Sequence, residues 1–209
     1  LMPGFNEENA VERPVIDSMA GVGWTYKPGN TLVRSTNDVL NEQDLRAALI
    51  RLNPSIAADP SRADEVIYKL RNVLIGVSSA GLVTFTAGPE RRFDVVGYVN
   101  GIPFVVGEAK SPVRPAVTWV DGAIQVNSDY EVNVPSFFVP NVFSFATEGR
   151  EFRYGTVQMP VNQWGPWRTG DDVFVGLRAV LDSVKSILAP AVLLDIARNF
   201  TAFATDRRQ

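Results

Sequence analysis

The sequence predicts an α/β protein in which a mixed β-sheet is flanked by helices. Two observations lead to this prediction. Apolar residues recur at helical spacing in the first 75 residues and again near the C-terminus, whereas the stretches between residues 81 and 157 are short, β-rich or alternating. Helices that precede and follow a central group of strands can cover the faces of one sheet, which is typical of the α/β and α+β classes.

Three helices are expected before the sheet, each with an apolar stripe on one side. Pro14 falls inside the first of them, so that helix is either kinked or begins just before the proline. Pro54 is expected to end the second helix. The predicted ranges are 6–20, 38–52 and 61–75.

The central segments are predicted to form strands. Asn100-Gly101 joins two β-rich stretches and is a strong signal for a β-hairpin. Two apolar stripes, interrupted at Pro190, predict a pair of C-terminal helices that begin near Phe174. Strands are expected at 81–88, 93–99, 102–110, 136–147 and 151–157, with a helix at 116–130.

The composition limits the chemistry. The 209 residues include neither cysteine nor histidine, which excludes disulfides, thiolate chemistry, Ser-His-Asp catalysis and His-ligated zinc sites. Any metal must therefore be held by oxygen ligands, as magnesium, manganese and calcium are. The net charge of −3 does not suggest bulk attraction to nucleic acid, so such a role would need a local basic patch or a partner.

No apolar run approaches the length of a transmembrane helix, and no signal peptide is visible. A soluble, cytoplasmic protein without a membrane partner is therefore expected. Because the chain begins at Leu1 and ends in "DRRQ", we expect it to be a fragment of a longer polypeptide.

The stretch "FVVGEAK" (104–110) ends a predicted buried strand in two opposite charges. Side chains alternate between the faces of a strand, so Phe104, Val106, Glu108 and Lys110 are expected on one face. The simplest explanation is a salt bridge where the strand meets water. The alternative is a metal-dependent phosphodiesterase site, which requires a further acid.

Asp94, in the partner strand, is the candidate for that acid. A strict two-residue Asn100-Gly101 turn would set Asp94 opposite Gly107, facing away from Glu108. A three-residue turn or a glycine bulge at Gly101 would shift the register by one residue and bring Asp94 to the face of Glu108. The catalytic interpretation therefore predicts a break in ideal two-residue register.

If these residues converge, they suit a magnesium site. Two carboxylates, Asp94 and Glu108, and the backbone carbonyl of Ala109 are ligands that octahedral magnesium accepts, with manganese as a substitute. The metal would activate water and offset charge on a phosphodiester. Lys110 would orient the attacking water and stabilise the phosphate of the transition state.

The segment "FDVVGYVNGIPFVVGEAKSP" resembles the PD-(D/E)xK nuclease segment of the R (restriction and translocation) subunit of type I restriction-modification enzymes. The stretches "AVERPVIDSMAGVGWTY", "VPSFFVPNVFSFATEGREFRYGT" and "LLDIARNFTAF" are also similar to parts of that family. Arg92-Phe93-Asp94 departs from the usual proline before the aspartate. The resemblance is diffuse, spans nearly the whole chain and has one specific block at 93–112.

The resemblance implies a restriction-endonuclease-like mixed sheet flanked by helices, with Asp94 and Glu108 as magnesium ligands and Lys110 as the catalytic lysine. Residues 1–170 would form the nuclease domain, and 171–209 would form helices that pack on it and lead toward a motor. The implied substrate is double-stranded DNA. The implied partners are an ATP-driven motor of the same polypeptide and the modification and specificity subunits. No P-loop occurs here, so ATP would act only through a motor outside this chain.

Many relatives carry a Q-x-x-x-Y motif after the lysine, which positions the active site. Here Gln125 is followed by Tyr130 at a spacing of five, which turns two side chains apart on an ordinary helix. Either an irregular helix restores their pairing, or Tyr130 serves only in packing.

Other charged residues are weaker candidates. Glu12 corresponds to a glutamate of the family's N-terminal helix and is either a further metal ligand or an exposed helix-end acid. Three arginines flank the site in sequence and are candidates for phosphate contacts, although an arginine of this kind is, taken alone, more often a solvated charge. They are Arg91, Arg92 and Arg114.

Two alternative functions remain open. One is a different PD-(D/E)xK nuclease, of the repair or resolvase type. The other is a catalytically inactive nuclease-like domain with a structural or coupling role. Binding of magnesium or manganese that depends on Asp94 and Glu108 would separate the nucleases from the inactive domain.

Overall fold

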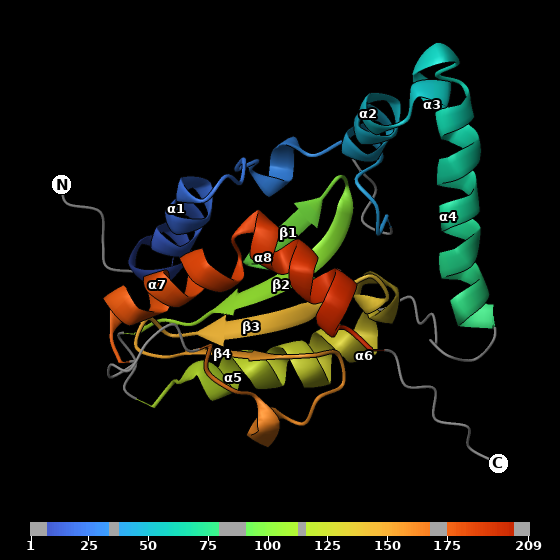
Figure 1. The fold of residues 1–209 in the computed structure, drawn as a ribbon. Helices are drawn as coiled ribbons and strands as arrows, with labels where there is room; N and C mark the ends of the chain where they lie inside the picture. Colours follow the sequence, from blue (N-terminus) through green and yellow to red (C-terminus); the bar gives the residue numbers. More distant parts are fainter. Residues whose placement is uncertain (1–7, 34–37, 80–90, 113–115, 168–174, 203–209) are drawn as a thin grey trace.

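The computed structural model describes the chain except for residues 1–7, 34–37, 80–90, 113–115, 168–174 and 203–209. For residues 75–79 only the backbone is described. The strand predicted at 81–88 and the candidate Arg114 lie outside the described residues. The predicted fold class is confirmed, because the described residues form a mixed β-sheet with helices on both faces (Figure 1).

Among the described residues, the sheet has four strands in the order β1-β2-β3-β4. β1 and β2 form an antiparallel hairpin, β2 and β3 are parallel, and β3 and β4 are again antiparallel. The parallel pair requires a crossover, which the helical segment after β2 supplies. The strands are β1 (Val95–Val99), β2 (Ile102–Ala109), β3 (Phe143–Thr147) and β4 (Phe152–Gly155).

Helices cover the two faces of this sheet (Figure 1). The N-terminal helix and the two C-terminal helices lie on one face, and the crossover helices lie on the other. A further group, α2 to α4, extends beyond the hairpin tip. The α-helices are α1 (Arg13–Gly21), α2 (Glu42–Leu52), α3 (Pro54–Ala58), α4 (Arg62–Ser79), α5 (Trp119–Ile124), α6 (Glu131–Asn133), α7 (Leu177–Ile187) and α8 (Pro190–Asp195).

In the described part of the chain, three π-helical turns and three 3₁₀ turns extend or connect these helices. The π turns adjoin α1, α5 and α8, so each continues a regular helix. They are η1 (Glu8–Glu12), η3 (Gln125–Tyr130) and η6 (Ile196–Phe200), and the 3₁₀ turns are η2 (Gly29–Thr31), η4 (Pro135–Phe138) and η5 (Val161–Gln163). None of the described helices combines the length and apolar character that a membrane span requires.

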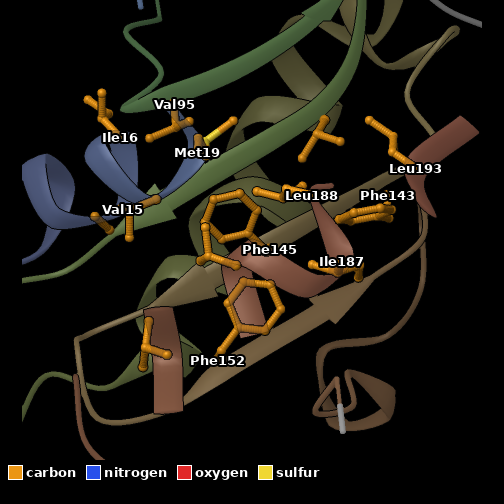
Figure 2. Close-up of a cluster of buried hydrophobic side chains, with 14 of the residues drawn as sticks. Val15, Ile16, Met19, Val95, Phe143, Phe145, Phe152, Ile187, Leu188 and Leu193 are labelled. Atoms are coloured by element: carbon orange, nitrogen blue, oxygen red, sulfur yellow. The ribbon is translucent and has the colours of Figure 1, made fainter. Parts of the chain in front are cut away.

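The larger core lies between the sheet and helices α1, α7 and α8. Figure 2 shows Phe143, Phe145 and Phe152 of the sheet packed among aliphatic side chains of these helices. Phe145 and Phe152 stack with ring centroids 5.2 Å apart. The α7 and α8 side chains in this core are fully buried, so the C-terminal helices are an integral part of the sheet's packing.

Several predicted boundaries were wrong for local reasons. The second helix begins at Glu42, four residues later than predicted, because Asn41 caps it by accepting a hydrogen bond from the Asp44 backbone. Pro54 does not only follow a helix but also begins the short α3, as proline can in a first turn. Residues 136–138 form a 3₁₀ turn rather than a strand, because prolines at 135 and 140 prevent strand pairing there.

Candidate active site

The β1–β2 hairpin has an ideal two-residue turn. Asn100 and Gly101 both have positive φ values, 52° and 82°, which is the geometry of a type I′ turn. Val99 and Tyr98 pair with Ile102 and Pro103 as such a turn requires. The prediction that the turn itself departs from ideal register was therefore wrong.

The register breaks further along the strands. Tyr98 pairs with Pro103, but Gly97 pairs with Val105, so Phe104 is an extra residue in β2. This β-bulge shifts the remaining pairs by one residue. Phe104 packs with the α1/α7/α8 core, so it does not share the face of Val106 as predicted.

The bulge brings Asp94 to the side of Glu108. Val95 pairs with Gly107, and the same register continued by one residue sets Asp94 opposite Glu108. The Asp94 carboxylate accepts a hydrogen bond of 2.9 Å from the backbone N–H of Ala109. Since the N–H and C=O of one residue in a strand point to the same edge, the Ala109 carbonyl also faces Asp94. The shift in register that the catalytic interpretation requires is confirmed.

Lys110 joins this group through Glu108 and Gln125. Its ammonium lies 2.7 Å from Glu108 Oε1 and 2.5 Å from Gln125 Oε1. The Glu108 side chain is almost fully buried, so the pair is not a solvated salt bridge at the end of a strand. A buried ion pair is weak evidence for stability, which leaves function as the better explanation for it.

The π-helical turn η3 restores the pairing of Gln125 with Tyr130. A π-helix bonds residues five apart, so a spacing of five places both side chains on one side. Gln125 Nε2 donates to the Tyr130 hydroxyl, which in turn lies 3.1 Å from Glu108 Oε2 and 2.9 Å from the Arg92 carbonyl. Of the two alternatives for Tyr130, the irregular helix is the one observed.

The helix α5 approaches the site closely because Gly122 has no side chain. A Cβ atom at this position would lie 3.2 Å from the Ala146 Cβ and 3.4 Å from the Glu108 Cγ. The capping box of Thr118 and Asp121 fixes the start of the same helix. Both features position the end of α5 so that the Gln125 side chain can bind the Lys110 ammonium.

Both carboxyl groups of the site have pKa values above their ordinary ones. Burial, and secondarily the neighbouring Asp94, raises the pKa of Glu108 to about 7. Burial also raises the pKa of Asp94, although the Ala109 N–H, Lys110 and Arg92 act in the opposite direction. Burial raises the pKa of the Tyr130 hydroxyl, so that it stays a hydrogen-bond donor.

This donor set fits a hard divalent cation. Asp94 uses one oxygen for the Ala109 N–H and retains the other, while Glu108 and the Ala109 carbonyl supply further oxygens on the same side. Within the described residues no three acidic side chains gather closely enough to hold a metal by themselves. Glu12 is thus not part of the cluster, although it lines the same groove as Asp94.

That groove is an open cleft of about 1090 Å³. It follows β1 from Asp94 to Gly101, between the segment around α1 and η2 on one side and α2 at the far end. The three predicted arginines have different settings. Arg91 is paired with Asp129 at 2.7 Å, Arg92 is exposed in the groove, and Arg114 lies outside the described residues.

Two acidic residues near the site were not predicted from the sequence. Asp129 holds Arg91 and thereby connects η3 with the segment before β1. Glu148 follows β3 directly, and the parallel register of Ala109 with Thr147, continued by one residue, sets it opposite Lys110. It is 5% exposed, and burial raises the pKa of its carboxyl although the backbone N–H groups of Trp119 and Glu151 bind it. In the sequence Glu148 falls between the strands predicted at 136–147 and 151–157, which indicates a turn and no chemical role.

The buried carboxyl group of Glu131, the residue after Tyr130, should make the stability of the protein depend on pH. Burial raises its pKa to about 7, despite hydrogen bonds from the Gln158 backbone and Asn127. The folded state therefore binds a proton that the unfolded state releases near pH 4.5, so the free energy of unfolding should fall as the pH rises from 5 to 8. The slope for one such group approaches about 1.4 kcal/mol per pH unit.

The Glu131→Gln variant should lose this contribution. Chemical denaturation of metal-free protein between pH 5 and 8 should show a smaller slope in the variant than in the wild type. Asp17→Asn, which removes an exposed carboxylate from α1, should leave the slope as it is. Equal slopes in Glu131→Gln and the wild type would contradict the prediction.

Comparison with known proteins supports one family. A family model described as "Type I restriction enzyme R protein N terminus" matches residues 4–163. The chain belongs to this family. The resemblance inferred from residues 93–112 is thereby confirmed.

A curated relative from Haemophilus influenzae, named "Type I restriction enzyme HindI endonuclease subunit", is 23% identical over 256 residues. The alignment covers 95% of this chain and 24% of the relative. The chain thus spans about a quarter of the length of this relative of the family. No solved structure matches the chain.

Proposed function

We propose that this chain is the magnesium-dependent endonuclease domain of a type I restriction enzyme R subunit and that it hydrolyses phosphodiester bonds of double-stranded DNA. The observation that carries the proposal is the one-residue register shift at Phe104, which gathers Asp94, Glu108 and Lys110 on one face. A structural salt bridge between Glu108 and Lys110 would not need Asp94 beside it. Family membership supports the same conclusion.

Asp94, Glu108 and the Ala109 carbonyl would hold the cation, for which manganese can substitute. When bound, the metal supplies Lewis-acid stabilisation of the phosphate and lowers the pKa of its water. The Ala109 N–H fixes the orientation of the Asp94 carboxylate. Tyr130 holds one oxygen of Glu108 and keeps that side chain from rotating away. Glu12, which lines the groove, would add an outer ligand at most.

Lys110 would act on the substrate directly. An ammonium has three donors, and two of them point to Glu108 and Gln125. The third would bind the scissile phosphate or the attacking water, and Gln125 fixes the direction in which it points. Positioned charge of this kind stabilises the negative charge that develops on the phosphate.

The wider assembly follows from the family. A full-length R subunit would carry an ATP-driven motor beyond the helices of 171–209, and modification and specificity subunits would select the DNA site in the cytoplasm. ATP would act through that motor alone. The modest charge of this chain fits such a division, because other parts would hold most of the DNA.

Metal binding tests the proposal against an inactive nuclease-like domain. Titration of the full-length subunit with Mn²⁺, followed by calorimetry or electron paramagnetic resonance, should reveal a site that weakens at least about 10-fold in Asp94→Asn and in Glu108→Gln. Asp182→Asn, on the outer side of α7, is the matched control and should bind like the wild type. An Mn²⁺ affinity that neither Asp94→Asn nor Glu108→Gln changes would refute the enzymatic proposal.

A further inference from the structure

Of the catalytic group, Asp94 alone is among the residues that line the groove along β1, and the proposed hydrolysis does not use the far end of this groove. From Asp94 to Asn100 the strand advances six residues, or about 20 Å at roughly 3.3 Å per residue. This is the axial length of about six nucleotides at 3.4 Å per phosphate of one strand. The groove is therefore long enough for a segment of a nucleic-acid strand.

The charge of the groove differs from that of the chain. Its lining includes four cationic side chains, Lys27, Arg51, Arg91 and Arg92, and three acids, Glu12, Asp44 and Asp94. Lys27 pairs with Asp44 and Arg91 pairs with Asp129, whereas Arg51 and Arg92 are exposed. The whole chain has a net charge of −3. Exposed arginines toward both ends of a groove, on a protein of negative net charge, form the local basic pattern that contacts a phosphate backbone.

Arg51 marks the end of the groove opposite to the catalytic site. It is an exposed residue in the last turn of α2, and its guanidinium lies 3.2 Å from Asn100 Oδ1 at the hairpin tip. The tip itself is fixed, because the Gly101 carbonyl accepts a hydrogen bond of 2.8 Å from the Asn41 backbone. Arg51 is thus held at a defined distance from Asp94 by two packed elements.

Neutral hydrogen-bonding groups complete the lining between the two ends. Asn30 and Asn100 line the groove, and the Trp24 indole forms a rigid wall because its N–H donates to the Leu188 carbonyl at 2.6 Å. Such side chains contact phosphates and sugars without reading bases. A site of this kind binds DNA irrespective of sequence.

We propose that the groove between Asp94 and Arg51 binds the DNA strand that flanks the scissile phosphate, over about six nucleotides, with Arg51 as its distal phosphate contact. The inference rests on the proposed nuclease function. It assigns to α2 and to residues 24–30, which lie outside the catalytic group, the task of aligning the strand. The proposed contact would not depend on the base sequence of the DNA.

Cross-linking in the full restriction complex tests the location. A photoreactive benzoylphenylalanine at Asn30, in the groove, should cross-link to duplex DNA during translocation in a Lys110→Ala background that does not cut. The same group at Tyr68, exposed on α4 and outside the groove, should not. Cross-links from position 30 to protein instead of DNA, or no cross-links there, would overturn the proposal.

Salt dependence tests the role of Arg51. With one phosphate contact removed, Arg51→Ala should lower the slope of log cleavage rate against log salt by about 1, and Arg51→Lys should restore it. Arg46→Ala, on the same helix but outside the groove, should keep the wild-type slope.

An unchanged slope in Arg51→Ala, or an equal change in Arg46→Ala, would overturn the phosphate contact. Failure here is distinguishable from failure of the nuclease proposal. In the first case Lys110→Ala still abolishes cleavage while the groove variants behave like the wild type. In the second case Lys110→Ala itself cuts DNA normally.

Discussion

Replacement of Lys110 by alanine should lower the DNA cleavage rate of the full complex by about 10³-fold and leave ATP-driven translocation unchanged. The size of the effect is that of removing one positioned catalytic group from a largely desolvated site. Translocation should persist because it would depend on a motor outside this chain. Single-turnover cleavage of plasmid DNA and a triplex-displacement assay measure the two activities separately.

The structure also supplies the controls for this substitution. Lys69→Ala removes an exposed lysine that pairs with Glu65 on α4, far in sequence from the site, and should cut at the wild-type rate. Lys110→Arg keeps the charge, but its planar guanidinium cannot reproduce a point charge between Glu108 and Gln125, so little activity should return. Cleavage by Lys110→Ala within a few-fold of wild type would exclude the proposed role.

The catalytic interpretation of the sequence required Asp94 to share a face with Glu108, but it placed the necessary register shift at the Asn100-Gly101 turn. Asn100-Gly101 has the residues that favour a type I′ turn and forms one, so the local sequence determines the structure of the turn. The bulge lies at Phe104 instead, where the side chain gains a place in the core beside α1 and α7. That gain depends on helices far away in the chain, so local pattern alone cannot place the bulge.

The pairing of Gln125 with Tyr130 has a similar origin. On an α-helix a spacing of five separates these residues, and a short sequence does not reveal that a π turn is preferred. The tertiary contacts of Tyr130 with Glu108 and the Arg92 carbonyl, and of Asp129 with Arg91, are made from that turn. Such contacts can offset the poorer geometry of a π turn, and they become visible only once the sheet is assembled.

The helix and strand types were easier to predict than the close approaches between them. The amphipathic stripes of α1 and α7 are confirmed by burial of Val15, Val180 and Val184 in one core. Gly107 and Gly122 gave no comparable signal, because a glycine within an apolar stretch does not identify its partner. Gly107 faces Phe145 and Gly122 faces Ala146, both from the parallel strand β3.

Gly107→Ala should lower the free energy of unfolding by about 3 kcal/mol and disturb the site. A Cβ atom at this position would lie 2.2 Å from the Phe145 ring, which is fully buried and stacked on Phe152. The ring cannot swing away into solvent, so the strand or the core must shift, at the cost typical of overpacking. Because Glu108 is the next residue, the shift should also weaken Mn²⁺ binding.

A double-mutant cycle identifies the ring as the cause. Phe145→Leu alone should destabilise the protein by about 1 kcal/mol through the cavity that it leaves. In the double variant the added methyl group should fill part of that space, so the combined loss should be at least about 1 kcal/mol smaller than the sum of the two single losses. Gly165→Ala has no atom within 4 Å of the added Cβ and should be close to neutral in chemical denaturation. Additive losses in the cycle would mean that Gly107 is required for its backbone conformation rather than for the space that Phe145 occupies.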